Sequence, residues 1–198
     1  MSSPVLAEEL RPSARVPARL YDACLVAGFS LLTAISAQVS IPLPFTPVPV
    51  TLQTFAVVLT GALLGSKRGA LAVLLYLAEG FAGLPVFSLG RAGIVHLLGP
   101  TGGYLVGFIA AAWLTGFLVE RRLAASLPGG LLVLIAGYLT PYLTGVAWLG
   151  TSVGFPRALS LGFLPFLPAD ALKVAASVGA LVGANILSAQ AARRRQSR

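Results

Sequence analysis

Ile41-Pro-Leu-Pro-Phe-Thr-Pro-Val-Pro49 interrupts a run of 44 uncharged residues that lies between Asp22 and Lys67. A helix that spans a bilayer needs about 20 mainly apolar residues, so the run is long enough for two such helices. The four prolines of the quoted stretch have no backbone N–H and are excluded from the interior of a regular helix. The sequence therefore predicts two membrane helices that are joined by a stiff, extended connector.

The composition of the whole chain agrees with a membrane location. Of its 198 residues, 57% are hydrophobic and only 10% are charged, whereas an ordinary soluble domain carries about 25% charged residues. This composition excludes most soluble enzymes, and its high hydrophobicity excludes intrinsic disorder. Cys24 is the single cysteine of the sequence, which excludes a disulfide-stapled scaffold.

Apolar runs of spanning length, separated by Pro, Gly and charged residues, recur along the chain. They predict an all-α integral membrane protein with six transmembrane helices, at about residues 21–38, 49–66, 69–85, 103–119, 130–150 and 168–189. The domain prediction has three parts. Residues 1–20 are a basic, solvated cytoplasmic segment, residues 21–190 are a single six-helix membrane domain, and residues 191–198 are a basic cytoplasmic tail.

The distribution of cations predicts the orientation. Placing both termini in the cytoplasm puts eleven of the 14 Lys and Arg residues on the inner side, as the positive-inside tendency requires. The net charge of +8 is explained in this way by topology and by contact with anionic lipid. Because no basic run is interleaved with aromatic residues, nucleic acid is not an expected partner.

Small residues at a spacing of four predict where helices approach closely in lipid. GxxxG pairs occur at Gly61 and Gly65, at Gly103 and Gly107, and at Gly179 and Gly183. The first predicted helix carries small residues on one face, namely Ala23, Ala27, Ser30 and Ala34. Two interpretations stay open for this face: packing within the protein, or docking of a partner subunit.

Three charged residues on the predicted outer half are not explained by topology: Arg91, Asp170 and Lys173. Ionisable groups near a membrane span generally line a cavity or a pathway. Asp170 and Lys173 are three residues apart in a helix that begins at prolines, so their side chains lie on one face. A purely structural alternative is that Asp170 favours the helix dipole and Lys173 only pairs with it.

The same region offers hydrogen-bonding groups but no recognised catalytic or metal-binding pattern. Gln53 and Tyr104 lie at predicted outer helix ends. His96 has no second His or Cys at ligand spacing, so neither a metal nor a cofactor is expected, and no motif of a hydrolytic enzyme occurs. The sum of the charges of Arg91, Lys173 and Asp170 is +1, which suits a small monoanion.

Four motifs resemble those of the BioY family, the biotin-specific substrate-binding (S) components of energy-coupling factor (ECF) transporters. The resemblance covers about residues 21–190 and rests on these stretches: Ile41 to Gln53, Gly83-Leu-Pro-Val-Phe87, Leu98-Gly-Pro-Thr-Gly-Gly-Tyr-Leu105 and Pro165-Phe-Leu-Pro-Ala-Asp-Ala-Leu-Lys173. It implies the ECF S-component fold, with a cavity near the outer face that is closed by the connector after the first helix.

The resemblance also implies a ligand and its contacts. The family's Arg, Asp and Lys for biotin handling correspond to Arg91, Asp170 and Lys173. The biotin carboxylate suits Arg or Lys, and the ureido ring suits Asp170 or Gln53 together with Lys173. The apolar thiophane ring is expected against aromatic residues, namely Phe87 or Tyr104. Which cation meets which end of biotin stays open.

For partners, the resemblance implies a transmembrane coupling protein and two ATPase subunits, docked through the small-residue face of the first helix, or a homo-oligomer if the protein works alone. The implied location is a bacterial cell membrane, with multiple passes and lipid contact, and the implied function is biotin uptake without enzymatic activity. Two alternatives are an S component for another small anionic vitamin and, from a different class, a membrane enzyme or structural subunit.

Overall fold

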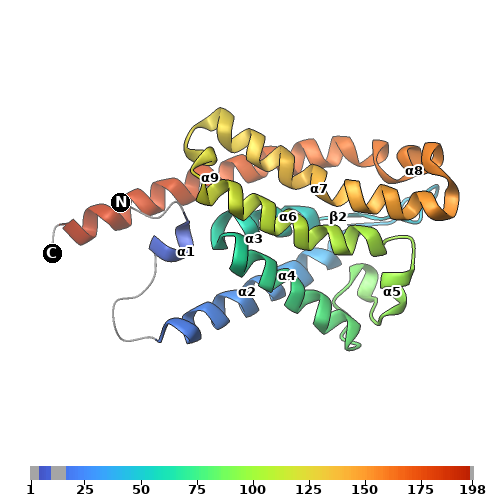
Figure 1. Ribbon diagram of the computed structural model, residues 1–198, viewed down its shortest axis with the longest axis horizontal. Coiled ribbons are helices and arrows are strands. Elements are labelled where there is room, and N and C mark those ends of the chain that lie inside the picture. Colours follow the sequence, from blue (N-terminus) through green and yellow to red (C-terminus); the bar gives the residue numbers. More distant parts are fainter. Residues whose placement is uncertain (1–4, 10–16, 197–198) are drawn as a thin grey trace.

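Helices account for nearly all of the computed structural model, which describes residues 5–9 and 17–196, with side chains up to residue 183 except that of residue 9. Each of the six predicted segments overlaps a helix, although the bounds differ by several residues in places. These are α2 (Ala18–Gln38), α3 (Gln53–Leu64), α4 (Ser66–Phe81), α6 (Gly102–Glu120), α7 (Leu127–Val153) and α9 (Leu167–Gln196). Figure 1 shows them packed side by side along the long axis of the molecule.

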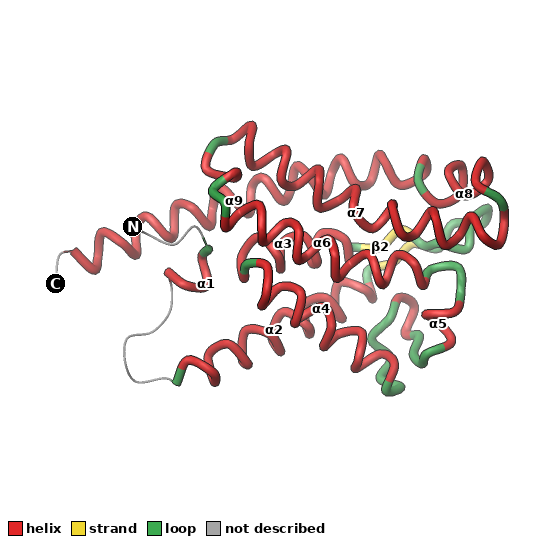
Figure 2. The backbone as a smooth tube through the Cα atoms, in the orientation of Figure 1, coloured by secondary structure: helices red, strands yellow, loops and turns green. Residues whose placement is uncertain are grey.

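Shorter elements connect these helices. They are α1 (Leu6–Glu9), β1 (Ser40–Ile41), β2 (Val50–Thr51), η1 (Ser88–Gly90), α5 (Val95–Leu98), η2 (Leu123–Ala125), α8 (Phe155–Gly162) and η3 (Leu164–Phe166). In Figure 1, α1 and the C-terminal part of α9 lie at one end of the molecule, and α5, α8 and β2 lie at the other. Figure 2 shows long loops and both strands gathered at this second end, which is called the loop end below.

Four segments of the described chain are long and apolar enough to cross a membrane: α2, α6, α7 and the stretch Phe155–Gly183. Helix α3 is apolar but has only 12 residues, which is about 18 Å of helix against a hydrocarbon core of about 30 Å. Helix α4 has 16 residues and begins with Ser66, Lys67 and Arg68. The protein is therefore a helical membrane protein, while the count of six crossing helices stays a prediction.

Two of the three predicted GxxxG pairs bring helices of this chain together. A Cβ at Gly61 of α3 would collide with the Ala112 carbonyl oxygen of α6. Gly103 and Gly107 of α6 are in equally close contact with α7, the first with its backbone at Thr144. Close van der Waals packing at such sites holds helices together in lipid, where the hydrophobic effect does not drive their association. The third pair differs, because a Cβ at Gly179 or Gly183 would meet nothing within 4 Å.

The connector after α2 lies over the loop end. Its outer parts pair as an antiparallel ladder, with Ser40 opposite Thr51, so the extended chain is a short hairpin rather than a free linker. The Thr46 hydroxyl donates to the Leu161 carbonyl oxygen at 2.8 Å. Val48 is buried in a cluster with Tyr104, Phe166 and other apolar side chains. The hairpin is thereby fastened to α8 and η3.

The N-terminal segment differs from the solvated lead-in that was predicted. Val5 and Ala7 are buried, and the Tyr21 hydroxyl donates to the Ala7 carbonyl oxygen at 2.9 Å. Arg68 of α4 forms ion pairs with Glu8 and with Asp22. Residues 5–9 therefore belong to the packed end of the bundle. Several cations in the orientation argument lie outside the described residues or their side chains: Arg11, Arg15, Arg193, Arg194, Arg195 and Arg198.

The small-residue face of α2 is divided between two environments. Ser30 and Ala34 are buried within the protein, and the Ser30 hydroxyl donates to Glu79 Oε2 of α4 at 2.8 Å. Ala23 and Ala27, nearer the start of α2, are exposed. Packing within the chain thus accounts for the second half of the face, and the first half stays available for a partner.

Candidate functional site

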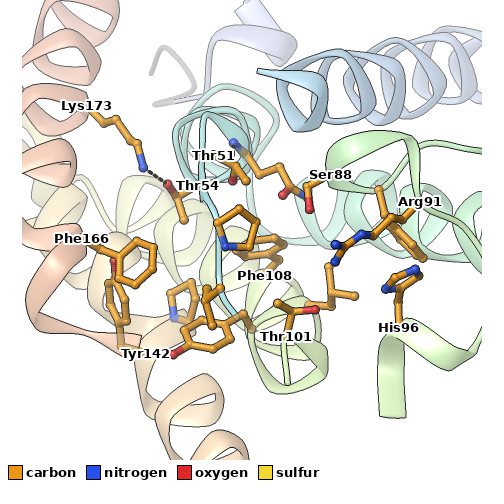
Figure 3. A pocket seen from close by; sticks show the side chains of 17 residues that line it. Thr51, Thr54, Ser88, Arg91, His96, Thr101, Phe108, Tyr142, Phe166 and Lys173 are labelled. Atoms are coloured by element: carbon orange, nitrogen blue, oxygen red, sulfur yellow. Dashed lines mark hydrogen bonds between the residues drawn. The ribbon is translucent and has the colours of Figure 1, made fainter. Parts of the chain in front are cut away.

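A cavity lies at the loop end, and part of it is open to the surroundings. Its walls come from segments far apart in the sequence: the connector hairpin, the first turn of α3, the loop from η1 to α6, and the facing parts of α6, α7, η3 and α9. Figure 3 shows the lining side chains, with Lys173 at one end of the cavity and Arg91 and His96 at the other.

The Lys173 end is a closed network of hydrogen bonds. Lys173 Nζ donates to Asp170 Oδ1 at 2.8 Å and to Thr54 Oγ1 of α3 at 3.0 Å. The Tyr142 hydroxyl of α7 donates to the other carboxylate oxygen of Asp170. Two of the three N–H groups of Lys173 are therefore used inside the protein, and the third is available toward the cavity.

The sequence around Lys173 explains why a charge pair is stable there. Pro165 and Pro168 introduce α9, and Asp170 lies in its first turn, where the helix dipole favours an acid. The side chains of Asp170 and Lys173 are only 8% and 10% exposed. Buried charges need both a partner and further hydrogen bonds, and Thr54 and Tyr142 supply these bonds from two other helices.

The Arg91 end is built from loops. Arg91 is exposed, and none of the ion pairs between described side chains includes it. The Phe87 N–H donates to the Arg91 carbonyl oxygen at 3.0 Å, which closes the loop into a tight turn. His96 of α5 lies edge-to-face against the Phe87 ring. Burial, and then the positive charge of Arg91, lower the pKa of His96, which lies between the predicted spans.

Aromatic side chains line the cavity between its two ends. Phe87 is buried and packs against Tyr76 and other rings. The Tyr104 hydroxyl donates to the Gly162 carbonyl oxygen at 2.8 Å, and its ring lies edge-to-face against that of Tyr142. These contacts fix an apolar passage with polar groups at either end, an arrangement typical of sites for amphipathic small molecules.

Five of the six predicted ligand-binding residues share this cavity. Arg91, Lys173, Gln53, Tyr104 and Phe87 line it, and Asp170 lies behind Lys173 as its ion-pair partner. The Gln53 amide nitrogen donates to the Tyr76 hydroxyl at 2.7 Å, so part of its hydrogen-bonding capacity is used within the protein.

Sequence reasoning missed several lining residues. Thr54 directly follows Gln53, and both residues lie in the first turn of α3. The reasoning that predicts Gln53 as a hydrogen-bonding residue therefore applies to Thr54 as well. Tyr142 and Phe166 lie in uncharged runs where aromatic residues are frequent, so they give no separate signal. His96 has no second His or Cys at metal-ligand spacing, and the sequence gives no other signal for its place in the cavity wall. Among the described residues, no group of three or more His, Cys, Asp or Glu side chains is placed to hold a metal ion.

Comparisons with known proteins agree on one family. The sequence model of the BioY family matches residues 10–190. A probable biotin transporter BioY of Pyrococcus horikoshii is 42% identical over 158 residues, which are 79% of this chain and 91% of the relative. The biotin transporter BioY of Thermotoga maritima is 43% identical over 149 residues, or 74% of this chain and 85% of that protein.

A solved structure is similar to most of this chain. It is the crystal structure of the S-component for biotin from an ECF-type ABC transporter. The similarity has a TM-score of 0.75 at 30% sequence identity, and covers 82% of this chain and 89% of the other.

Proposed function

The chain belongs to the BioY family, and we propose that it captures biotin in the loop-end cavity as the S component of an uptake transporter. The observation that carries this proposal is the cavity itself. At one end Lys173 is paired with Asp170, and at the other end Arg91 has no ion-pair partner among the described residues. Aromatic side chains line the passage between these two ends. Biotin has the matching order of groups: a polar neutral ring system, an aliphatic chain and a carboxylate.

The charges favour one orientation of the ligand. The charge of Lys173 is already balanced by Asp170, whereas the exposed Arg91 is not balanced in this way. A carboxylate therefore gains more at Arg91, whose guanidinium can bind it through two parallel hydrogen bonds. At the other end, the free N–H of Lys173 suits the ureido carbonyl oxygen. The hydroxyl oxygens of Thr54 and Tyr142 can accept hydrogen bonds from the ureido N–H groups.

The proposed transport of biotin across the membrane needs other subunits. Biotin enters from the outer side, and both termini lie in the cytoplasm of a bacterial cell, with six helices crossing the membrane. A transmembrane coupling protein and two ATPase subunits supply the energy for release, and the exposed Ala23 and Ala27 of α2 offer them a small-residue face. If the protein works alone, the same face suits a second copy of the chain.

Calorimetric titration of the detergent-purified protein tests binding and orientation together. We expect wild-type protein to bind biotin, and to bind its neutral carboxamide more weakly. Arg91→Ala should lower the affinity for biotin about 10-fold to 100-fold, because a charge-assisted hydrogen bond contributes about 1.5 to 3 kcal/mol. The same variant should change the affinity for the carboxamide less than 3-fold.

The results separate the parts of the proposal. No heat with biotin, together with displacement by another vitamin in a competition panel, would contradict the ligand. An equal loss of affinity for both compounds in Arg91→Ala would leave biotin as the ligand and contradict the orientation. Lys173→Met should instead weaken both compounds to the same degree, because both carry the ureido ring.

A further inference from the structure

Gln38, the last residue of α2, holds a loop that belongs to the binding cavity. Its amide nitrogen donates to the Phe87 carbonyl oxygen at 3.2 Å, and also lies near the carbonyl oxygens of Val86 and Pro85. Its amide oxygen accepts from the Gly90 N–H at 3.1 Å. Both ends of one side chain are thus bonded to the backbone of one short turn, at positions three residues apart.

The turn that Gln38 holds is strained. Leu89 has φ of 62° and ψ of 29°, the left-handed region that a branched L-residue rarely adopts, and Gly90 follows with φ of 66°. Such a conformation costs about 1 to 3 kcal/mol and persists only where the surroundings enforce it. The hydrogen bonds of Gln38 to Phe87 and Gly90 fall on either side of Leu89, where they oppose relaxation of the turn.

The turn carries three cavity residues, Phe87, Ser88 and Arg91. Helix α4 holds the two ends of the segment, because the Leu84 and Gly93 N–H groups donate to carbonyl oxygens of α4 at 3.1 and 2.8 Å. Gln38 holds the middle, from a different helix. It does not line the cavity.

We propose that Gln38 is a positioning residue for the ligand. It sets the place of Arg91 and Phe87 through the turn at residues 87–91, without touching the ligand itself. The inference rests on the proposed function, because it assigns a role in the same biotin site. It also makes the outer end of α2 a part of the recognition machinery, although α2 contributes no side chain to the cavity wall.

A double-mutant cycle in biotin titrations tests the proposal. Gln38→Ala removes the neutral hydrogen bonds to Phe87 and Gly90 and should raise the Kd for biotin about 10-fold. In the Arg91→Ala background, Gln38→Ala should raise the Kd for biotin less than 3-fold, because the Arg91 side chain that Gln38 positions is already absent. Ser66→Ala serves as the matched control, since it removes the hydrogen bonds from the Ser66 hydroxyl to the Glu120 carboxylate at the opposite end of α4. It should lower the thermal midpoint without changing the Kd.

Hydrogen exchange gives a readout that a general loss of stability would not produce. In Gln38→Ala, peptides that cover residues 85–93 should take up deuterium faster than in wild type, while peptides of α7 stay unchanged. An unchanged Kd, a full 10-fold loss in both backgrounds, or unchanged exchange at residues 85–93 would overturn the proposal. Failure of wild-type protein to bind biotin would instead overturn the proposed function, and the exchange result would still report on the turn.

Discussion

The two ends of the cavity hold their charged groups in opposite ways. At one end, Asp170 and Lys173 are buried on α9 and are bonded to side chains of α3 and α7. At the other end, Arg91 is exposed on a loop whose conformation depends on a strained turn and on Gln38. A site fixed by three helices is preorganised, whereas loops are drawn from the less stable parts of a fold. We infer that the Lys173 end of the cavity selects the ligand and that the Arg91 end adjusts around it.

Removing the negative charge of Asp170 should have the largest effect on stability and on biotin affinity. Asp170→Asn keeps the shape of the side chain but leaves Lys173 buried without its counter-charge. Breaking a buried pair in this way costs about 3 to 5 kcal/mol, so we expect a marked fall in the free energy of unfolding and a loss of biotin affinity of more than 100-fold. Thermal unfolding and calorimetry of the same preparations measure both effects.

A double variant separates folding from recognition at this end. Asp170→Asn with Lys173→Met removes both charges, and replacing a buried ion pair by neutral groups is often close to neutral for stability. The double variant should therefore regain most of the wild-type thermal midpoint and still fail to bind biotin. Wild-type affinity in the double variant would show that Asp170 and Lys173 have a structural role only. It would contradict the inference that their end of the cavity selects the ligand.

Two glycines allow the same disturbance to be made at either end. A Cβ at Gly145 of α7 would collide with the Tyr104 ring, and a Cβ at Gly80 of α4 would collide with the Phe87 ring. Tyr104 is carried by α6 and is anchored by its hydroxyl, so the packing strain of about 1 to 3 kcal/mol should appear as lost stability in Gly145→Ala. In Gly80→Ala the loop can shift, so the thermal midpoint should fall less while biotin affinity falls several-fold.

The control for these substitutions is Gly179→Ala in α9, where an added Cβ would meet nothing within 4 Å. It should leave both the thermal midpoint and the affinity near the wild-type values, or raise stability slightly, because Ala favours a helix over Gly. An equal loss of stability in Gly80→Ala and Gly145→Ala would contradict the proposal that the Arg91 end of the cavity is the more adjustable one.

The same difference between the ends explains what the sequence could reveal. Asp170 and Lys173 were identifiable because charges are rare in such a chain and because a spacing of three places both on one helix face. Arg91 was identifiable by charge alone. The four prolines after residue 41 predicted a break between two helices, and the hairpin formed in this break covers the cavity.

What escaped prediction depends on contacts between distant segments. Nothing in the sequence brings Thr54 or Tyr142 to Asp170 and Lys173, because these contacts join residues 28 or more positions apart. The role of Gln38 is equally hidden, since its partners lie about 50 positions away and are backbone groups. Small side chains on α2 indicated close packing but did not show that Ser30 and Ala34 face the protein while Ala23 and Ala27 do not.

The smallest expected effect concerns His96 and the pH. Burial and the charge of Arg91 lower its pKa from 6.5 in the folded protein. The unfolded chain therefore binds more protons as the pH falls below about 7, and the free energy of unfolding of the ligand-free protein should decrease over that range. A bound carboxylate beside Arg91 would favour the protonated imidazole. Biotin binding should then take up protons, and affinity should rise about 2-fold between pH 7.5 and pH 5.5.

Titrations of His96→Gln over the same pH range provide the comparison. The variant keeps a polar side chain without a titrating group, so its affinity should be constant where that of wild type rises, and the neutral carboxamide should show no rise with either protein. A rise that persists in His96→Gln would assign the proton to another group. A constant wild-type affinity would place the carboxylate away from the Arg91 end of the cavity, because the imidazole lies beside Arg91 and would respond to a negative charge there.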